Sequence, residues 1–148
     1  MQVTIKSLNH QGFGEAILED GQKVTVPYTL TGETGDVEEG QKNKQGYKAN
    51  LNEVISPSPQ RSPAPCQHFT QCGGCALQHI KPSKQLELKQ TILLEQLQHF
   101  GQITPRNLLP AIRGDAFGYR RKARLSVRYV AKKGLALVGF RETNGRFV

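Results

Sequence analysis

Residues 65–79 read PCQHFTQCGGCALQH and hold all three cysteines of the 148-residue chain, in the spacing Cys-x5-Cys-x2-Cys. Between the last two cysteines, Gly73 and Gly74 let the backbone turn sharply enough for both thiolates to face one centre. Pro63 and Pro65 disfavour a helix through the first cysteine. The stretch therefore predicts a loop in which three thiols can share one centre: Cys66, Cys72 and Cys75.

These thiols have several interpretations. A disulfide framework is disfavoured, because three is an odd number and the first residues of the chain lack a secretory signal. A structural zinc site needs a fourth ligand, for which His68 and His79 are the candidates. An iron–sulfur cluster also needs four ligands, which are usually all cysteines. The spacing favours a metal over inert buried thiols, but it leaves the choice between iron and zinc open.

Charge divides the chain into two parts. The net charge is +8, but residues 1–60 carry five basic and eight acidic side chains, whereas residues 61–148 carry fifteen basic and four acidic ones. A basic part joined to a mildly acidic part indicates two modules, one of which faces a polyanion such as nucleic acid. No apolar run approaches the roughly 20 residues that a membrane span requires, so we expect a cytoplasmic protein without a membrane partner.

Residues 1–57 show the pattern of a small β-barrel. Val3 and Ile5 alternate with polar residues, as in a strand with one buried face. Asp20-Gly21 predicts a hairpin turn, and further glycines separate about five short strands, a number typical of a closed or nearly closed barrel of OB-like size. Gly12-Phe13-Gly14 lacks the third glycine of a dinucleotide site and precedes a strand, so it predicts a bend.

Residues 58–65 form a proline-rich connector, which predicts the boundary between this barrel and a second, partial domain over residues 66–148. Ser83 is the candidate N-cap of a helix over residues 83–100, and Gly101 is its expected stop. The helix has an apolar face that we expect to pack in a core: Leu86, Leu93, Leu97 and Phe100.

Residues 119–141 predict a basic antiparallel hairpin. Residues 119–129 alternate apolar and cationic side chains, and Lys133-Gly134 turns the chain into a return strand. A sheet with a row of cations on its open face is suited to RNA, because guanidinium groups neutralise phosphates. The alternative is a solvated edge strand whose charges prevent aggregation. The predicted RNA-binding residues are Arg120, Arg121, Lys122, Arg124, Arg128 and Arg141.

Taken together, these features resemble the RNA uracil-5-methyltransferase family, whose members use S-adenosylmethionine, and in particular its 23S ribosomal RNA branch. Residues 1–57 look like the TRAM domain of that branch, a small RNA-binding barrel. Residues 66–79 are similar to its cluster motif, and residues 118–124 (GYRRKAR) and 138–141 (VGFR) look like the strands that precede its fourth cysteine. The tRNA branch is expected to lack both TRAM and cluster, which favours ribosomal RNA.

The resemblance implies a mainly β fold with one helix, in which an OB-like TRAM barrel precedes a partial α+β central domain with a [4Fe–4S] cluster. Cys66, Cys72 and Cys75 would be three of its ligands, and the fourth is missing from this chain. The full-length parent would be an S-adenosylmethionine-dependent 23S rRNA (uracil-5-)-methyltransferase, with its cofactor site and catalytic residues in a domain absent here. We therefore expect the chain alone to recognise 23S ribosomal RNA as a monomer and to be catalytically inactive.

Two other functional classes are compatible with parts of the pattern. A stand-alone RNA-binding module with a zinc knuckle would use the three cysteines together with His68 or His79. The radical methylthiotransferases also join TRAM to an iron–sulfur site. They place a Cys-x3-Cys-x2-Cys triplet ahead of TRAM, so both the order and the spacing disagree with this chain.

Overall fold

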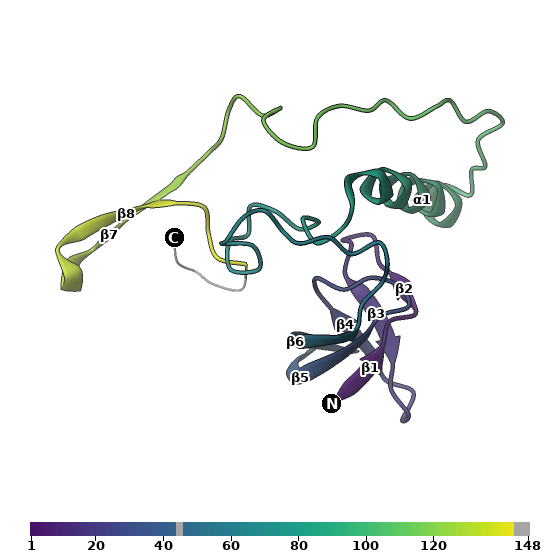
Figure 1. Cartoon of the computed structure of the whole chain (residues 1–148), viewed down its shortest axis with the longest axis horizontal. Helices are drawn as coiled ribbons and strands as arrows, with labels where there is room; N and C mark the ends of the chain where they lie inside the picture. The colour runs from purple at the N-terminus through teal and green to yellow at the C-terminus, as the bar shows by residue number, and fades with distance from the viewer. Residues whose placement is uncertain (44–45, 144–148) are drawn as a thin grey trace.

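A six-stranded sheet occupies the N-terminal part of the chain in the computed structural model, which describes residues 1–43 and 46–143 (Figure 1). The strand order is β1-β5-β6-β4-β3-β2, and neighbouring strands are antiparallel except for the parallel pair β4 and β6. The strands are β1 (Gln2–Thr4), β2 (Ser7–Leu8), β3 (Gly14–Ile17), β4 (Lys23–Val26), β5 (Thr34–Asn43) and β6 (Gly46–Ser56).

The sheet curls on itself because one segment supplies both of its edges. Only Ile5 and Lys6 separate β1 from β2, yet β1 pairs with β5 and β2 pairs with β3 at the opposite edge. The pairing continues through the gap, since the Ile5 N–H donates to the Glu33 carbonyl at 2.9 Å and the Lys6 N–H to the Glu15 carbonyl at 2.8 Å. The predicted mainly β fold with an OB-like barrel is confirmed, and the expected first strand is divided in two.

Alternate residues of these strands form the core of the barrel. Each fully buried Val or Ile side chain contributes about 1.5–3 kcal/mol, so a small set of residues can stabilise the barrel. At the predicted hairpin turn between β3 and β4, Gly21 has a left-handed φ of 80° and Asp20 Oδ1 accepts the Gln22 N–H at 3.0 Å. The core residues are Val3, Ile5, Ala16, Val24, Val26, Val37 and Ala49.

Helix α1 (Pro82–Gly101) begins and ends differently from its prediction. Its N-cap is Lys81 and not Ser83, because Pro82 takes the first helical position, where a missing N–H costs no hydrogen bond. At its other end Gly101 is still helical, and the left-handed conformation that usually falls to a glycine is adopted by Gln102, with φ 52°.

The apolar face of α1 is not packed in a core. None of its side chains, all of which lie in the described part of the chain, is buried, and Phe100 is 78% exposed. Of the described helices, none is long and apolar enough to cross a membrane. The expected core packing of this face is therefore not observed within residues 1–43 and 46–143.

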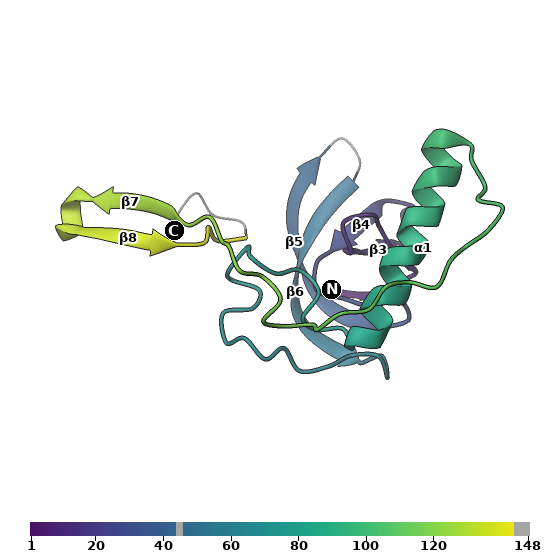
Figure 2. The same ribbon diagram turned by 90° about the horizontal axis from the view of Figure 1, so that it is seen from above.

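A two-stranded hairpin lies at the opposite end of the molecule from α1 (Figures 1 and 2). It consists of β7 (Ser126–Val130), the 3-10 turn η1 (Ala131–Lys133) and β8 (Leu135–Gly139), and Val127 pairs with Val138. The predicted antiparallel hairpin is confirmed, but it is shorter than expected. Residues 102–125 form an exposed connection, and residues 119–125 are not part of a strand.

The proline-rich connector is held in place at several points. Ser58 donates its N–H to a carboxylate oxygen of Glu33 at 3.0 Å, and the Ser62 N–H donates to the His79 carbonyl at 2.9 Å. The Lys81 N–H donates to the Gln60 carbonyl at 3.0 Å. The connector therefore docks between the barrel and the segment before α1, and it does not act as a free spacer.

Candidate functional site

The cysteine loop, residues 66–78, is closed by its own polar groups. The Cys66 N–H donates to Gln78 Oε1 at 3.2 Å, which ties the two ends of the loop together. The Gly74 N–H donates to Cys72 Sγ at 3.4 Å, and this hydrogen bond is weak because sulfur is a weak acceptor. All three thiols are free, with Cys72 half-buried and the other two, Cys66 and Cys75, exposed.

The donor set of this loop fits a soft metal, but its present geometry does not enclose one. Thiolates are the ligands that zinc and iron–sulfur clusters prefer. Within residues 1–43 and 46–143, no group of three His, Cys, Asp or Glu side chains converges to hold a metal ion. His68, one of the two candidate zinc ligands, is exposed, and its Nε2 lies 3.3 Å from the Gln67 amide nitrogen.

His79, the other candidate zinc ligand, is a buried packing residue. His79 is only 3% exposed. Its ring stacks on Phe69 with centroids 5.7 Å apart, and its Nε2 lies 3.4 Å from the Thr29 carbonyl oxygen. Its Nδ1 has no hydrogen-bond partner among the described residues. Burial, and then the positive charge of Arg61, lowers the pKa of His79 to about 4, so the ring is neutral at pH 7.

A buried ion pair joins the connector to the barrel. Both carboxylate oxygens of Glu33, which is fully buried, accept hydrogen bonds from Arg61 at 2.6 Å. The N–H groups of Leu30 and Ser58 also donate to this carboxylate, at 2.8 and 3.0 Å. Burial opposes ionisation of Glu33, but these hydrogen bonds outweigh it and hold the pKa of the carboxyl below its ordinary value. The barrel and the connector therefore form one unit.

The segment after β8, residues 140–143, returns to the cysteine loop. The Gly73 N–H donates to the Arg141 carbonyl at 2.8 Å, and the Thr143 N–H donates to the Gln71 carbonyl at 2.8 Å. A Cβ at position 73 would lie 3.0 Å from that Arg141 oxygen, so a side chain there would require the facing backbone to shift by a few tenths of an ångström. The end of the hairpin is thus brought beside the cysteines by a short antiparallel bridge.

Tyr28 connects the barrel to both of these segments. Its backbone is left-handed, with φ 64°, which is uncommon for a non-glycine residue and which surrounding contacts must stabilise. Its hydroxyl donates to Thr143 Oγ1 at 3.1 Å, and its ring lies edge-on to Phe69 with centroids 5.1 Å apart. Tyr28, Glu33 and Arg61 were not predicted from the sequence, because no spacing rule signals contacts between residues so far apart in the chain.

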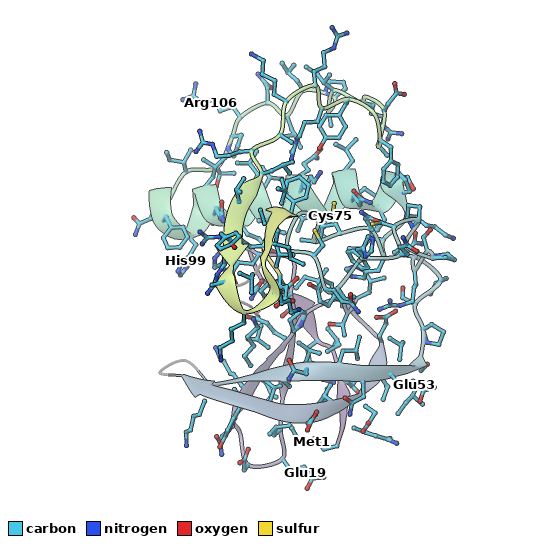
Figure 3. The ribbon with its side chains drawn as sticks, turned by 90° about the vertical axis from the view of Figure 1, so that its left-hand side faces the viewer. Met1, Glu19, Glu53, Cys75, His99 and Arg106 are labelled. Atoms are coloured by element: carbon cyan, nitrogen blue, oxygen red, sulfur yellow. The ribbon has the colours of Figure 1, made fainter. Side chains whose placement is uncertain are left out.

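The predicted RNA-binding side chains lie in and around the hairpin, and all of them are exposed. Arg128 is in β7, Arg141 follows β8, and the remaining four, Arg120, Arg121, Lys122 and Arg124, precede β7. Figure 3 labels acidic residues of the barrel, Glu19 and Glu53, on the side away from Arg106 and Cys75. These two acidic side chains of the barrel therefore lie apart from Arg106.

Known proteins similar to this chain were found at both the domain and the sequence level. Residues 1–60 match the family model described as "tRNA (uracil(54)-C(5))-methyltransferase, TRAM domain". Over 99% of its length, the chain is 44% identical to the 23S rRNA (uracil(1939)-C(5))-methyltransferase RlmD of Thiobacillus denitrificans and 46% identical to that of Xylella fastidiosa. It is 42% identical, again over 99% of its length, to that of Alkalilimnicola ehrlichii.

The chain spans about a third of the length of these relatives, 34%, 34% and 33% respectively. Among solved structures it is similar to the Pyrococcus abyssi tRNA (uracil-54, C5)-methyltransferase in complex with S-adenosyl-L-homocysteine, at 29% identity and a TM-score of 0.46. That match covers 66% of this chain and 21% of the other.

These matches confirm the resemblance to the RNA uracil-5-methyltransferase family and to the 23S ribosomal RNA branch within it. They also correct one step of the sequence analysis. The matching TRAM model carries the name of a tRNA enzyme, so a TRAM barrel by itself does not favour ribosomal RNA over tRNA. The resemblance to the 23S ribosomal RNA branch depends instead on the relatives that match 99% of the chain.

Proposed function

We propose that this chain is the RNA-recognising, cluster-bearing part of a longer cytoplasmic enzyme that uses S-adenosylmethionine to methylate C5 of a uracil in 23S ribosomal RNA. The observation that carries this proposal is the 42–46% identity to three enzymes of that name over 99% of the chain. Methyl transfer itself is assigned to the part of such an enzyme that these 148 residues do not match. The chain's own contribution is to bind RNA and to hold a metal cluster.

The RNA surface is assigned to the exposed cations in and around β7 and β8. Their guanidinium groups can each neutralise a phosphate and release its counterions, so affinity should fall steeply with salt. The barrel supports the same role, because the TRAM model matches it and carries the name of an RNA-modifying enzyme. Base-specific contacts would come from other groups, since phosphate contacts position RNA without reading its sequence.

The first prediction concerns the salt dependence of RNA binding. Replacing Arg124 and Arg128 together by alanine should reduce the slope of log affinity against log salt by about two units, if each contacts one phosphate. The affinity is measured by titrating 23S ribosomal RNA fragments with the chain at several salt concentrations. A matched control replaces Lys81 and Lys89, exposed cations of the α1 region, by alanine and should leave the slope near that of the unmodified chain. An unchanged slope in the arginine variant would show that these side chains are solvated and do not bind phosphate.

The metal site is assigned to Cys66, Cys72 and Cys75, as three ligands of a [4Fe–4S] cluster. Such a cluster would fasten the loop through its thiolates, and the bridge from residues 71–73 to residues 141–143 places Thr143 next to the loop. The expected fourth ligand is a cysteine that follows Thr143 in the longer enzyme. Because the described loop does not gather its thiols, cluster binding must tighten it.

The second prediction concerns which residues take up metal. Anaerobic reconstitution with iron and sulfide of a longer form that includes the expected fourth cysteine should give iron, sulfide and visible absorption of a cluster. Cys72→Ser should lower iron uptake strongly, whereas His68→Ala, a change in the same exposed loop, should not. Stoichiometric zinc with no iron, lost again in His68→Ala, would favour the zinc knuckle and rule out the cluster.

A further inference from the structure

A cleft of about 340 Å³ lies where the barrel, the cysteine loop and the returning segment meet. Phe13 of the barrel, Gly73 and Gly74 of the cysteine loop, and Phe140 at the end of β8 all line it. This volume is near the lower end of the range for small-molecule sites, so the cleft suits one small planar group. Cys75, one of the assigned metal ligands, also lines the cleft, so the cleft adjoins the metal site. Neither that site nor the row of cations explains its aromatic walls.

One wall is an aromatic ring beside bare backbone. Phe140 is 47% exposed, and a Cβ built on Gly74 would lie 3.6 Å from its ring. Because position 74 carries no side chain, no Cβ lies against this ring from the cysteine loop. An exposed ring offers a flat apolar surface on which another ring can stack.

The second phenylalanine of the cleft, Phe13, lies in a tight turn. Asn9 Oδ1 accepts the N–H groups of Gln11 and Phe13 at 2.9 and 3.0 Å, and Gly12 has φ 77°. The ammonium of Lys48 lies 5.8 Å from the centre of the Phe13 ring. The backbone that carries this ring is therefore held by the turn, and the ring lies close to a cation, as in many surfaces that stack nucleobases beside a phosphate backbone.

The charged groups at the cleft match a nucleotide. Arg141 lines the cleft and directly continues the basic hairpin through Phe140, so the phosphate backbone of an RNA lying on the hairpin can reach it. Glu142 also lines the cleft, and its carboxylate repels phosphate but accepts N–H groups. The arrangement thus favours a neutral base inside the cleft and its phosphate near Arg141.

We propose that this cleft binds one unpaired nucleobase of the RNA substrate, stacked on Phe13 and Phe140, with its backbone phosphate toward Arg141. The proposal deepens the proposed function and depends on it, since it assumes that RNA lies on the basic hairpin. Recognition of RNA sequence commonly uses bases that leave the stack and lie on aromatic side chains. The cleft would supply that contact at the junction of the barrel and the cysteine loop.

The test uses single-stranded RNA oligonucleotides that carry one 2-aminopurine, whose fluorescence is quenched when the base stacks. With the full chain, quenching at saturation should occur at one position of the oligonucleotide. Phe13→Leu and Phe140→Leu keep apolar volume but remove the aromatic face, so each should abolish this quenching and weaken binding by about ten-fold or more. Phe13→Tyr keeps the aromatic face, so it should show the quenching and the affinity of the unmodified chain. Phe100→Leu, a change at an exposed ring on α1, is the matched control and should alter neither quantity.

The possible outcomes separate this inference from the function on which it depends. If RNA binds with the expected salt dependence but quenching is absent, or survives both leucine substitutions, the cleft assignment is wrong and the RNA surface stands. If the unmodified chain binds no RNA, both are wrong. Far-ultraviolet circular dichroism of each variant checks that the barrel is folded. Quenching that persists in Phe13→Tyr shows that its loss in Phe13→Leu reflects lost stacking.

Discussion

At the scale of single residues, the molecule depends on polar groups buried between its parts. Glu33 comes from the loop between β4 and β5, and Arg61 comes from the connector. A carboxylate without exposure to water is costly unless it is paired and hydrogen-bonded, and Glu33 has four such bonds. Removal of the arginine would leave the carboxylate buried with only two backbone donors.

The third prediction follows from this pair. Arg61→Ala should lower the free energy of unfolding by about 3 kcal/mol, because it strands a buried charge. The measurement is urea unfolding followed by circular dichroism. The control, Lys84→Ala, removes the exposed ion pair between Lys84 and Glu87 and should cost less than about 1 kcal/mol. A loss in Arg61→Ala as small as that of the control would show that the pair does not hold the connector to the barrel.

The fourth prediction concerns pH and His79. The pKa of its ring falls from 6.5 to about 4 on folding, so between these values the unfolded chain binds a proton that the folded chain does not. Stability contributed by the neutral ring is therefore present above pH 6.5 and is lost as the pH falls toward 4, by up to roughly 3 kcal/mol. Glu33, whose pKa is lowered from 4.5, begins to lose its contribution only as the pH falls below about 4.5, at the lower end of this range.

His79→Phe keeps the stacking on Phe69 but cannot be protonated. It should flatten the dependence of unfolding free energy on pH between about 6.5 and 5, a window above the ordinary pKa of Glu33. His68→Phe, which changes an exposed histidine, is the control and should keep the slope of the unmodified chain. If the two substitutions give equal slopes, burial of His79 does not contribute to acid sensitivity.

At the scale of elements, short sequence patterns predicted the strands and turns that form through interactions between residues close together in the chain. The alternation at Val3 and Ile5 and the Asp20-Gly21 turn indicated strands and a hairpin, and these form because side chains on one face are buried together. The apolar face of α1 was predicted to pack in a core, but in the described part of the chain none of its residues is buried. Spacing along a helix identifies an apolar face without identifying what lies opposite.

Other differences arise from tertiary contacts. Residues 119–125 were predicted to continue β7, but the returning chain leaves the hairpin at Gly139 and pairs with the cysteine loop instead, so they have no strand opposite them. The three thiols could be recognised from spacing alone. The contacts of Tyr28 with Phe69 and Thr143 could not, because they join residues that only the folded chain brings together.

The fifth prediction concerns the end of α1. Gln102 is left-handed with φ 52°, a conformation that costs a residue with a Cβ about 1 kcal/mol and costs glycine little. Gln102→Gly should therefore raise the stability of the helix by about 0.5–1 kcal/mol. The control, Glu95→Gly in the helix interior, should lower it by about 1 kcal/mol. Helicity is followed by circular dichroism on heating, and equal losses in both variants would contradict the role assigned to the left-handed cap.

At the scale of the whole molecule, stability should be unevenly distributed. The barrel has a buried core, and Ile80 and His79 extend burial to the segment before α1. Helix α1 and the strands β7 and β8 contain no buried residue in the described part of the chain. In proteins most of the stability of a helix comes from packing of its apolar face, and an isolated two-stranded hairpin is marginally stable in water. Both elements therefore need a covering that the barrel does not supply.

The last prediction tests this distribution by amide hydrogen exchange. In the 148-residue chain, amides in the paired parts of β5 and β6 should exchange about 100-fold or more slowly than those of α1, because they open only when the core opens. In a chain extended to the length of the relatives, of which this one spans 34%, α1, β7 and β8 should gain protection while the barrel changes little. The barrel serves as the internal control in both measurements. Equal protection of α1 and the barrel in the shorter chain would mean that α1 is already stabilised by the residues described, and that its open apolar face needs no further partner.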